Sequence, residues 1–529
     1  MKRWNGWGDI ATSYPLQPSA LDYLGGRLGI LHPYTDAALE DILPAVPESR
    51  LPHYPGVDIN PEKRLCYARG QSLPDWVALR SGRIPFFPDG VACPETADEI
   101  CTFIDFARRS GARLIPYGGG TSVVGHINPP QSDAPVLTLS LERLNRLLDL
   151  DETSHLATFE AGAPGPHLEA QLKRRGYTLG HFPQSFEYST LGGWIATRSS
   201  GQQSYYYGRI EDLFAGGRVE TPQGRLELPD FPASAAGPDL REIVLGSEGR
   251  LGVITQARLR VRPQPEAEEF NGVFFPTWEQ GVVALRAAVQ EDMRVSMLRL
   301  SNPLETETTL VLSGKNWVHL ADRGLRLLGY KDQRCLLIYG ATGSHAQVRQ
   351  VRRAAAALFR RFGGLSMGKL VGHTWEKSRF LSPYLRNTLW ECGVAVDTLE
   401  TALPWAQVQA ASVAIPQAIE AAARSCSEET LAFAHLSHVY RDGASIYATS
   451  LFRRKADPEE LLTTWRSMKH AASQVIQKLG GTISHQHGVG LDHAPYLPAE
   501  KGTLGMNALR AIFQTMDPDG MMNPGKLYE

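Results

Sequence analysis

The sequence predicts an α+β protein with more than one domain. Its 529 residues are too many for one compact hydrophobic core. Up to about residue 262, short apolar runs mix with helical patterns and glycine turns, and beyond that point long helical patterns alternate with strands. The second pattern suits an antiparallel sheet covered on one face by helices. Hydrophobic residues make up 43% of the chain, which is typical of a globular protein.

Changes of composition divide the chain into four predicted segments. Residues 1–83, rich in proline, glycine and aromatic side chains, are expected to form an N-terminal extension packed on the body. Residues 84–265 carry the short strands, and residues 266–500 carry the long helices. Residues 501–529 contain two turn sequences close together, so we expect this segment to return to the 84–265 domain.

Hydrophobic periodicity places the elements of the 84–265 domain. Ile100, Phe103, Ile104 and Ala107 recur at helical spacing and predict a helix over 98–109. Short apolar runs between turns predict the other elements, which are strands over 113–116, 136–140 and 158–162 and a helix over 167–175. This mixture of short strands and helices is an α+β pattern.

The 266–500 domain has longer and more regular elements. Its predicted helices cover 278–292, 345–362, 405–424 and 457–479. Its predicted strands cover 295–301, 335–342, 431–438 and 444–451. A sheet of such strands needs one apolar layer of helices to bury it, and the four helices supply that layer.

Charge and cysteine usage narrow the class of protein. The formal net charge of −2 gives no electrostatic attraction to nucleic acid, so we expect no nucleic-acid partner. No apolar run is long enough to span a bilayer and the first residues do not resemble a signal peptide, so a cytoplasmic location is expected. Peripheral contact with a membrane stays open. The six cysteines form no CxxC pair and are interpreted as reduced thiols.

A glycine loop, PYGGGTS at 116–122, is the first candidate site. Three glycines allow close backbone approach, so that successive N–H groups can point at one anion. Thr121 and Ser122 add hydroxyl donors. The loop lacks both the GxGxxG pattern of a dinucleotide-binding βαβ unit and the GK[ST] of a phosphate-binding P-loop. The alternative interpretation is a plain glycine-rich turn.

Further glycine turns follow at loop positions. They are GGWIAT at 192–197, GRIED at 208–212 and GSEGRLGVIT at 246–255. Several such turns, each beside a short strand, can surround a large dinucleotide along its whole length. The sequence therefore favours a dinucleotide site over an isolated turn.

These turns together resemble the FAD-binding domain of the vanillyl-alcohol oxidase superfamily, over about 84–265. The resemblance implies a two-subdomain, PCMH-type FAD-binding domain, with a separate substrate (cap) domain. It also implies that FAD is cradled by Pro116, Gly118, Gly119, Gly120, Thr121, Ser122, Gly125, Pro183, Ser185, Thr190, Gly192, Gly193, Ser200, Glu248, Gly252 and Ile254. Members with covalent flavin carry a histidine within the first loop, and this chain has glycine there, so non-covalent FAD is expected. His126 is the one nearby candidate for a covalent link.

Four stretches resemble one family of this superfamily, the alkyldihydroxyacetonephosphate synthases. They are RWNGWG at 3–8, GHFPQSFEYST at 180–190, LETALPW at 399–405 and SHQHGVG at 484–490. The resemblance implies a transferase of ether-lipid synthesis. Such an enzyme exchanges the acyl chain of acyl-dihydroxyacetone phosphate for a fatty alcohol through a flavin N5 adduct, with no net redox change.

The same resemblance assigns roles by position. Tyr447 matches the catalytic acid/base tyrosine, whose pKa of about 10 must be lowered to act as a base at neutral pH; the alternative is an ordinary strand tyrosine. Arg299 lies between apolar neighbours and is either an inward anion clamp or a solvent-facing charge. Arg386 is the second candidate for binding the substrate phosphate.

Histidines complete the predicted site. By resemblance His485 and His487 lie close to the flavin, and we assign them with Tyr447 and Arg299 to catalysis. His181 is another candidate beside the flavin ring. Gln486 stands where the family has the middle histidine of three, so a titrating or phosphate-binding role is altered there. His181, Gln486, His438 and Arg386 form the predicted substrate-binding set.

A second hypothesis comes from HLSHVYRDG at 435–443, which resembles the GHxGDGNxH segment of D-2-hydroxy-acid dehydrogenases. It implies an FAD-linked oxidase or dehydrogenase of a D-2-hydroxy acid or another alcohol. Those enzymes bind a divalent metal through two histidines and a glutamate, and this chain has Gln486 and about Tyr447 at two of those positions, so no metal site is predicted. A variant site of His435, His438 and either His485 or His487 stays open. A homodimer is expected because relatives often form one.

Overall fold

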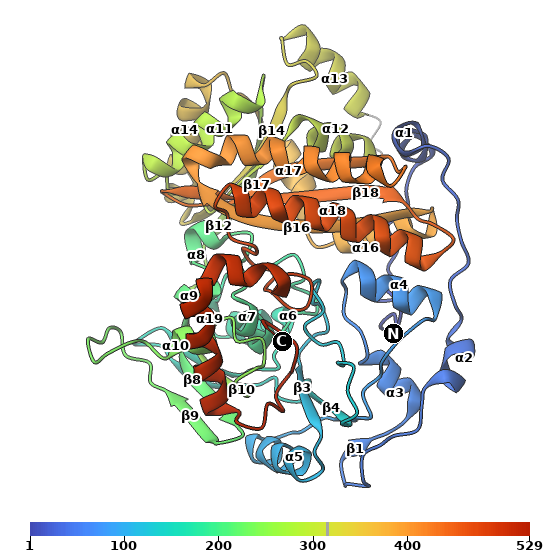
Figure 1. Ribbon diagram of the computed structural model, residues 1–529. Helices are drawn as coiled ribbons and strands as arrows, with labels where there is room; N and C mark the ends of the chain where they lie inside the picture. Colours follow the sequence, from blue (N-terminus) through green and yellow to red (C-terminus); the bar gives the residue numbers. More distant parts are fainter. Residues whose placement is uncertain (314–316, 529) are drawn as a thin grey trace.

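The computed structural model describes residues 1–313 and 317–528, and it contains three main sheets (Figure 1). The first sheet has the strand order β1-β2-β4-β3 and the second the order β5-β6-β10-β8-β9. The third has seven strands in the order β15-β12-β14-β13-β17-β18-β16, and all its pairs are antiparallel. The predicted α+β class is confirmed.

The N-terminal extension contains several short helices. They are α1 (Pro18–Leu28), α2 (Leu39–Ile42), the 3-10 helix η1 (Leu43–Ala45), α3 (Pro61–Cys66) and α4 (Leu73–Ser81). Helix α4 begins with a capping box between Ser72 and Asp75 and ends at Gly82, whose positive φ suits glycine. In Figure 1, α1 lies against the seven-stranded sheet and α4 lies between that sheet and the first one.

The first sheet places the glycine loop. It consists of β1 (Val57–Asp58), β2 (Gly90–Ala92), β4 (Val136–Ser140) and β3 (Arg113–Tyr117), and it packs on α5 (Ala97–Arg109). The apolar face predicted for this helix is buried. Strands β2, β4 and β3 are parallel, so the loop at 116–122 leaves the carboxyl end of β3 at the edge of the sheet.

The second sheet is antiparallel and surrounds the later glycine turns. Its strands are β5 (Leu147–Asp151), β6 (Leu156–Glu160), β8 (Phe214–Thr221), β9 (Gly224–Leu228) and β10 (Val253–Arg260). Its helices are α6 (Gly165–Lys173), α7 (Leu191–Thr197), α8 (Ser204–Tyr207), α9 (Ile210–Leu213) and α10 (Arg241–Val244). A short ladder joins β7 (Tyr177–Thr178) to β11 (Arg262–Pro263).

The seven-stranded sheet contains strands that the sequence analysis missed. Its strands are β12 (Ala267–Phe275), β13 (Met297–Ser301), β14 (Cys335–Gly343), β15 (Leu365–Gly368), β16 (Val394–Pro404), β17 (Thr430–Val439) and β18 (Gly443–Arg453). Strands β12, β15 and β16 were not predicted. Strand β16 carries the charged residues Asp397 and Glu400, which interrupt its apolar pattern, although Glu400 is only 1% exposed.

Helices lie on both faces of this sheet, where only one covered face was expected. The predicted face packs on α11 (Trp278–Gln290), α14 (His345–Arg361), α17 (Trp405–Ser425) and α18 (Pro458–Lys478). The opposite face carries α12 (Pro303–Leu312), α13 (Trp317–Leu327), α15 (Lys369–Ser378) and α16 (Ser382–Glu391). Neighbouring strand residues therefore enter different cores: Leu337 packs in the first and Leu336 in the second.

The C-terminal residues contact the first sheet. After the 3-10 helix η2 (Ala494–Tyr496) and α19 (Leu497–Met516), the chain runs beside β3. The Leu114 N–H donates to the Met521 carbonyl at 2.9 Å, and the Asn523 N–H donates to the Leu114 carbonyl at 2.8 Å. Met521 and Met522 are buried in the core of this sheet.

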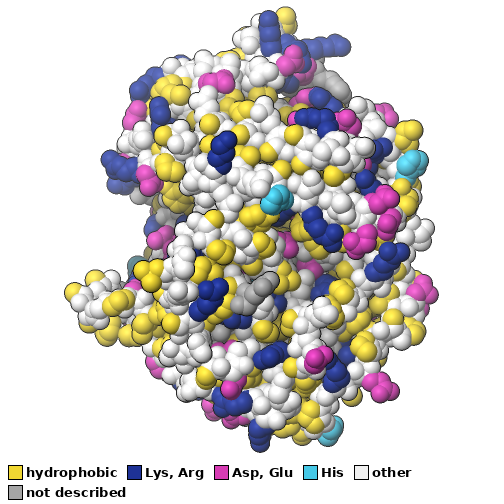
Figure 2. Space-filling view, in the orientation of Figure 1, with side chains coloured by type: hydrophobic (Ala, Val, Ile, Leu, Met, Phe, Trp, Pro, Cys, Tyr) yellow, Lys and Arg dark blue, Asp and Glu magenta, His cyan; other side chains and the backbone are white. Residues whose placement is uncertain are grey.

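Surface charge follows the near-neutral composition. Figure 2 shows basic and acidic side chains interspersed with hydrophobic ones over the face that it presents. Among the residues described, no helix combines the length and the hydropathy that crossing a bilayer requires.

Candidate active site

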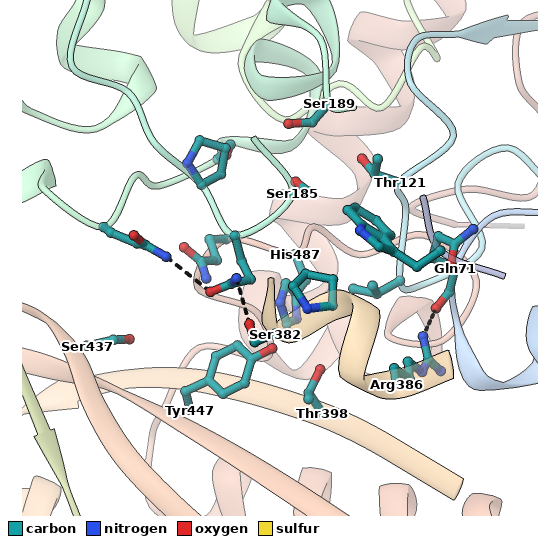
Figure 3. A pocket seen from close by; sticks show the side chains of 18 of the residues that line it. Gln71, Thr121, Ser185, Ser189, Ser382, Arg386, Thr398, Ser437, Tyr447 and His487 are labelled. Carbon is teal, nitrogen blue, oxygen red and sulfur yellow. Dashed lines mark hydrogen bonds between the residues drawn. The ribbon is translucent and has the colours of Figure 1, made fainter. Parts of the chain in front are cut away.

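A cavity of about 840 Å³ lies between the first two sheets and the seven-stranded sheet. One wall consists of the glycine loop and the turn before α7. The other consists of strands β16, β17 and β18 with the turn at 484–490. Figure 3 shows these two walls: Thr121, Ser185 and Ser189 lie at one side, and Tyr447, Thr398 and Ser437 rise from the strands at the other.

The glycine loop has no room for side chains. A Cβ atom on Gly119 would lie 1.8 Å from the Tyr188 carbonyl oxygen, and one on Gly118 would lie 2.3 Å from Thr190 Oγ1. Gly120 has a φ of +71°, which L side chains rarely adopt. The loop can therefore present its backbone N–H groups to a ligand at close range.

The residues predicted to cradle the cofactor line this cavity, with the exception of Gly125. Gly125 instead shapes the loop, with a φ of +77° beside Asn128 and Leu491. Thr190 Oγ1 and Asn523 Oδ1 are buried without a hydrogen-bond partner, and both residues line the cavity. Polar atoms left in this way fit a cofactor that bears both donors and acceptors.

Glu248 lines the cavity, but its carboxylate binds the protein. It accepts hydrogen bonds from the N–H groups of Val489, at 2.5 Å, and Gly490, at 2.8 Å. His126 Nε2 lies 3.1 Å from the same carboxylate, and His126 Nδ1 lies 2.8 Å from Ser122 Oγ. Glu248 thus joins the glycine turns to the 484–490 turn, and His126 has both ring nitrogens beside protein oxygens.

A row of three polar side chains crosses the seven-stranded sheet. Tyr447 pairs with Glu400 on one neighbouring strand and with His435 on the other. The His435 ring stacks on the Tyr447 ring at 5.0 Å, and the His487 ring meets it edge-on at 5.5 Å. Register alone therefore brings together residues that lie far apart in the sequence.

Arg299 is paired within the protein. Its Nη2 donates to Glu305 Oε1 at 2.7 Å, and His435 Nδ1 lies 2.9 Å from the same oxygen. Burial alone would raise the pKa of Glu305, but the charges of His435 and Arg299 outweigh it and lower the pKa to about 2. The ionised Glu305 offsets the charge of Arg299, which weakens Arg299 as an anion clamp.

Glu400 organises the 484–490 turn. Its Oε1 accepts hydrogen bonds from the N–H groups of Gln486, at 2.5 Å, and His487, at 2.6 Å. Burial opposes its ionisation, but the charge of His487 and the contact with His485 together hold the pKa of Glu400 below its ordinary value. Sequence reasoning gave no role to Glu400 or Glu305, because an isolated glutamate in a strand or helix carries no motif.

The two histidines of the turn have different surroundings. His487 lines the cavity, whereas His485 does not. The Nε2 of His485 accepts from Arg209 Nη1 at 2.6 Å and from the Tyr440 hydroxyl at 2.5 Å. An Nε2 that accepts from a guanidinium belongs to a neutral ring, and burial lowers the pKa of His485 accordingly.

His181 and His438 also differ. His181 is 1% exposed, does not line the cavity, and has Nε2 3.2 Å from Ser199 Oγ. Burial lowers its pKa to about 3. His438 lines the cavity, and its Nδ1 lies 3.1 Å from Ser200 Oγ. The structure thus brings His438 to the predicted site and leaves His181 behind the wall.

Arg386 is held without a counter-ion. Its Nη1 donates to the Gln71 carbonyl at 2.5 Å, and its guanidinium lies 4.2 Å from the Trp76 ring centroid. Burial lowers its pKa to about 10, and its Nε is buried without a partner. No carboxylate among the described residues lies within 4.0 Å of it. Figure 3 shows its bond to Gln71.

A further cation that lines the cavity, Arg379, was missed by the sequence analysis. Arg379, which follows α15, lies within 6 Å of the ring centroids of Phe182, Phe270, Trp375 and Phe380. Its Nη1 is buried without a partner. An arginine beyond the end of a helix carries no motif, and Phe182 and Phe270 reach it from distant parts of the chain.

An apolar arm extends the cavity between the seven-stranded sheet and helices α12, α15 and α16. The side chains that line it are Leu310, Leu312, Leu336, Ile338, Val371, Trp375, Leu381, Leu385, Leu389, Phe433 and Leu451. Such a lining suits an aliphatic chain, whose burial is favourable by about 0.8 kcal/mol per methylene. Within residues 1–313 and 317–528, no three His, Cys, Asp or Glu side chains are grouped to hold a metal ion.

Two models of known protein families match this chain. The family described as "FAD binding domain" matches residues 88–228, and "FAD linked oxidases, C-terminal domain" matches residues 264–527. The predicted FAD-binding PCMH-type fold is thereby confirmed, and FAD is the cofactor of this chain. The cavity wall made of glycine turns belongs largely to the first match.

Several relatives and solved structures that match this chain are alkyldihydroxyacetonephosphate synthases. The chain is 32% identical to alkyldihydroxyacetonephosphate synthase of Dictyostelium discoideum, over 88% of this chain and 77% of the relative. It is 29% identical to the Caenorhabditis elegans protein of that name, over 100% of this chain and 95% of the relative. A solved alkyldihydroxyacetonephosphate synthase structure, 28% identical, superposes with a TM-score of 0.85 and covers 99% of this chain and 98% of its own.

Proposed function

This chain belongs to the alkyldihydroxyacetonephosphate synthase family, whose members are FAD enzymes of ether-lipid synthesis. We propose that it exchanges the acyl chain of acyl-dihydroxyacetone phosphate for a fatty alcohol. Ester and alcohol enter, and ether and fatty acid leave, with no net redox change. FAD is held non-covalently, a proposal supported by the protein contacts at both ring nitrogens of His126.

One observation carries the proposal. A single cavity joins the glycine loop, Tyr447, the unpaired cation Arg386 and a long apolar arm. An acyl-dihydroxyacetone phosphate needs all of these features, because it has a phosphate at one end and an aliphatic chain at the other. A short hydroxy acid would leave the apolar arm unfilled.

In this proposal Arg386 binds the substrate phosphate, and Arg299 instead holds Glu305 and His435 in place. Arg386 has no acidic partner within 4.0 Å among the described residues, so a phosphate would be its counter-ion. Arg299 is already paired with Glu305 and His435. The positive charge of Arg386 is therefore available to a ligand in the cavity, whereas that of Arg299 is offset by Glu305.

Tyr447 holds the proton. Burial raises the pKa of its phenol, while Thr398 and Arg386 act in the opposite direction. The phenol accordingly carries its proton in the protein, and in this proposal it donates that proton to the acyl carboxylate as the carboxylate leaves C1 of the substrate. It later takes a proton from the incoming alcohol, and a positive group nearby assists that step. FAD, when bound, supplies the nucleophile that the exchange requires.

His487 orients Tyr447 and is itself oriented by Glu400. Its ring meets the Tyr447 ring edge-on, and its Nδ1 lies 3.7 Å from Glu400 Oε1. His485, Arg209 and Tyr440 form a support behind the turn. We therefore propose that His485 holds the turn in place, whereas the sequence analysis gave it a catalytic role. His181 is likewise proposed to be structural.

An anaerobic exchange assay tests the function. Purified holoenzyme is given acyl-dihydroxyacetone phosphate and hexadecanol, and the alkyl product, the free fatty acid and the flavin absorbance are measured. Equal amounts of product and fatty acid, without bleaching of the flavin, are expected. Bleaching by a D-2-hydroxy acid, with no alkyl product, would instead establish the oxidoreductase alternative.

The remaining expectations stay predictions. A homodimer is checked by light scattering, and peripheral membrane contact by flotation with phosphatidylcholine vesicles. A lipid-like substrate fits the apolar arm, and a membrane would be its source.

A further inference from the structure

The N-terminal sequence RWNGWG at 3–8 forms part of the cavity wall, although the proposed reaction gives it no role. Trp7 lines the cavity and is 7% exposed. Its ring packs edge-on against Tyr188 at 5.6 Å. Nearby, Lys2 Nζ donates to the Gly119 carbonyl of the glycine loop at 3.0 Å. The first residues of the chain thus contact the cofactor loop directly.

Two hydrogen bonds fix Trp7 to the helix that carries Arg386. The Trp7 N–H donates to Asn387 Oδ1 at 3.1 Å, and Asn387 Nδ2 donates to the Trp7 carbonyl at 2.9 Å. Arg80 reinforces the pair, because its Nη2 lies 3.2 Å from the same Asn387 oxygen. Since Asn387 follows Arg386 in α16, the position of Trp7 is tied to that of the arginine.

Gln71 connects the same two residues from another side. Its Nε2 donates to the Gly6 carbonyl at 3.3 Å, and its own carbonyl accepts from Arg386 Nη1 at 2.5 Å. The Trp76 ring carries the Arg386 guanidinium on its face. Trp7 and Arg386 therefore belong to one closely packed group around Gln71.

Two N–H donors of this group have no acceptor. Trp7 Nε1 and Arg386 Nε are both buried without a hydrogen-bond partner, and both residues line the cavity. An indole N–H can only donate, and a buried donor without an acceptor destabilises the protein. Both donors are therefore available to an oxyanion that occupies the cavity.

We propose that Trp7 is a substrate-binding residue whose indole N–H donates to a phosphate oxygen of the substrate held by Arg386. This inference rests on the proposed function. The cofactor also carries phosphates, but the two hydrogen bonds of the Trp7 backbone join it to Asn387, the neighbour of Arg386 in α16, and this favours the substrate phosphate. The N-terminal segment then closes the phosphate end of the site.

Gly6 and Gly8, on either side of Trp7, are required by the close packing of this segment. Gly8 has a φ of +77°, and a Cβ there would lie 2.3 Å from Tyr384 Cε1. A Cβ on Gly6 would lie 2.5 Å from Asn387 Oδ1. Only glycine at both positions lets the backbone of Trp7 approach α16 closely enough for the paired hydrogen bonds.

Trp7→Phe removes the indole N–H and keeps an aromatic ring. Trp4→Phe is the matched control, because Trp4 belongs to the same motif and packs on a separate core around Ile42 and Leu65. Holoenzymes of both variants and of Arg386→Met are compared with wild type. Dihydroxyacetone phosphate is titrated against flavin absorbance, and the KM values for acyl-dihydroxyacetone phosphate and hexadecanol and the FAD content are measured.

Trp7→Phe is expected to weaken dihydroxyacetone phosphate binding and raise the KM for the phosphate substrate by about tenfold or more, because a hydrogen bond to a charged group is lost. The KM for hexadecanol, the FAD content and Trp4→Phe should match wild type. If Arg386→Met loses phosphate binding and Trp7→Phe does not, this inference fails. Loss of FAD from Trp7→Phe would assign its donor to the cofactor and also overturn it. Wild-type binding by Arg386→Met would overturn the phosphate role of Arg386 in the proposed function.

Discussion

The two walls of the cavity work in different ways. The glycine loop offers backbone groups, and it requires glycine because a Cβ atom at these positions would overlap neighbouring atoms. The opposite wall, strands β16, β17 and β18 with the turn at 484–490, offers side chains whose charges are paired with one another. The first wall is local in sequence, whereas the second depends on strand register.

Sequence neighbours share a role in the first wall and have separate roles in the second. In the glycine loop, consecutive residues all line the cavity. In the turn, His485 and His487 are two residues apart, yet one contacts Arg209 and the other contacts Tyr447. Substitutions in the first wall should therefore all lower the affinity for FAD. In the second wall, some substitutions should lower turnover and others should lower the stability of the fold.

The largest effect is expected for Gly119→Val. Its side chain would overlap the Tyr188 carbonyl, which a Cβ atom alone would approach to 1.8 Å. The purified protein should be colourless, as measured by flavin absorbance at saturating FAD. Gly25→Ala in α1 is the control, because a Cβ there has no atom within 4 Å. A yellow Gly119→Val protein would show that the loop does not hold the cofactor.

Tyr447→Phe, in the second wall, should lower turnover without changing cofactor binding. We expect FAD content equal to wild type and a turnover number lower by about 10²- to 10⁴-fold, because a proton donor is removed. Tyr330→Phe removes a hydroxyl that donates to the Gly363 carbonyl outside the cavity, and it serves as the control. Unchanged turnover in Tyr447→Phe would exclude the phenol from the mechanism.

His485 and His487 in the 484–490 turn give the next comparison. His487→Ala should lower turnover by about tenfold or more with little change in melting temperature. His485→Ala should instead lower the unfolding free energy by about 1–3 kcal/mol, because Arg209 and Tyr440 lose their buried acceptor. Equal effects of the two variants on both measurements would contradict the division of roles.

Acid sensitivity supplies the smallest effect. The folded pKa of Glu305 is about 2 against an ordinary 4.5, so its contribution to stability is present above pH 4.5 and is lost as pH falls toward 2. Between pH 5 and 3.5 the difference in unfolding free energy between wild type and Glu305→Gln should shrink by about 1 kcal/mol. Chemical denaturation at several pH values measures it, and a constant difference would argue against an ionised Glu305.

Local pattern was enough for much of the fold. The apolar spacing of Ile100, Phe103, Ile104 and Ala107 predicted α5, and the observed helix buries these side chains. Strands β13, β14, β17 and β18 were also predicted within a few residues. Strand β16 was missed because Asp397 and Glu400 interrupt its pattern, and those charges are stabilised by Trp465, Lys469 and the 484–490 turn, which lie far away in the sequence.

The cofactor loop could be recognised in the sequence, since glycine spacing and backbone freedom are properties of consecutive residues. The family could be recognised as well, because several motifs occur together along one chain. Which candidate residues enter the cavity depends on the folded chain. Burial and partners placed His487 and Arg386 there, paired Arg299 with Glu305 and held His485 behind the turn. Those outcomes depend on strand register and on contacts between distant elements, which no local pattern records.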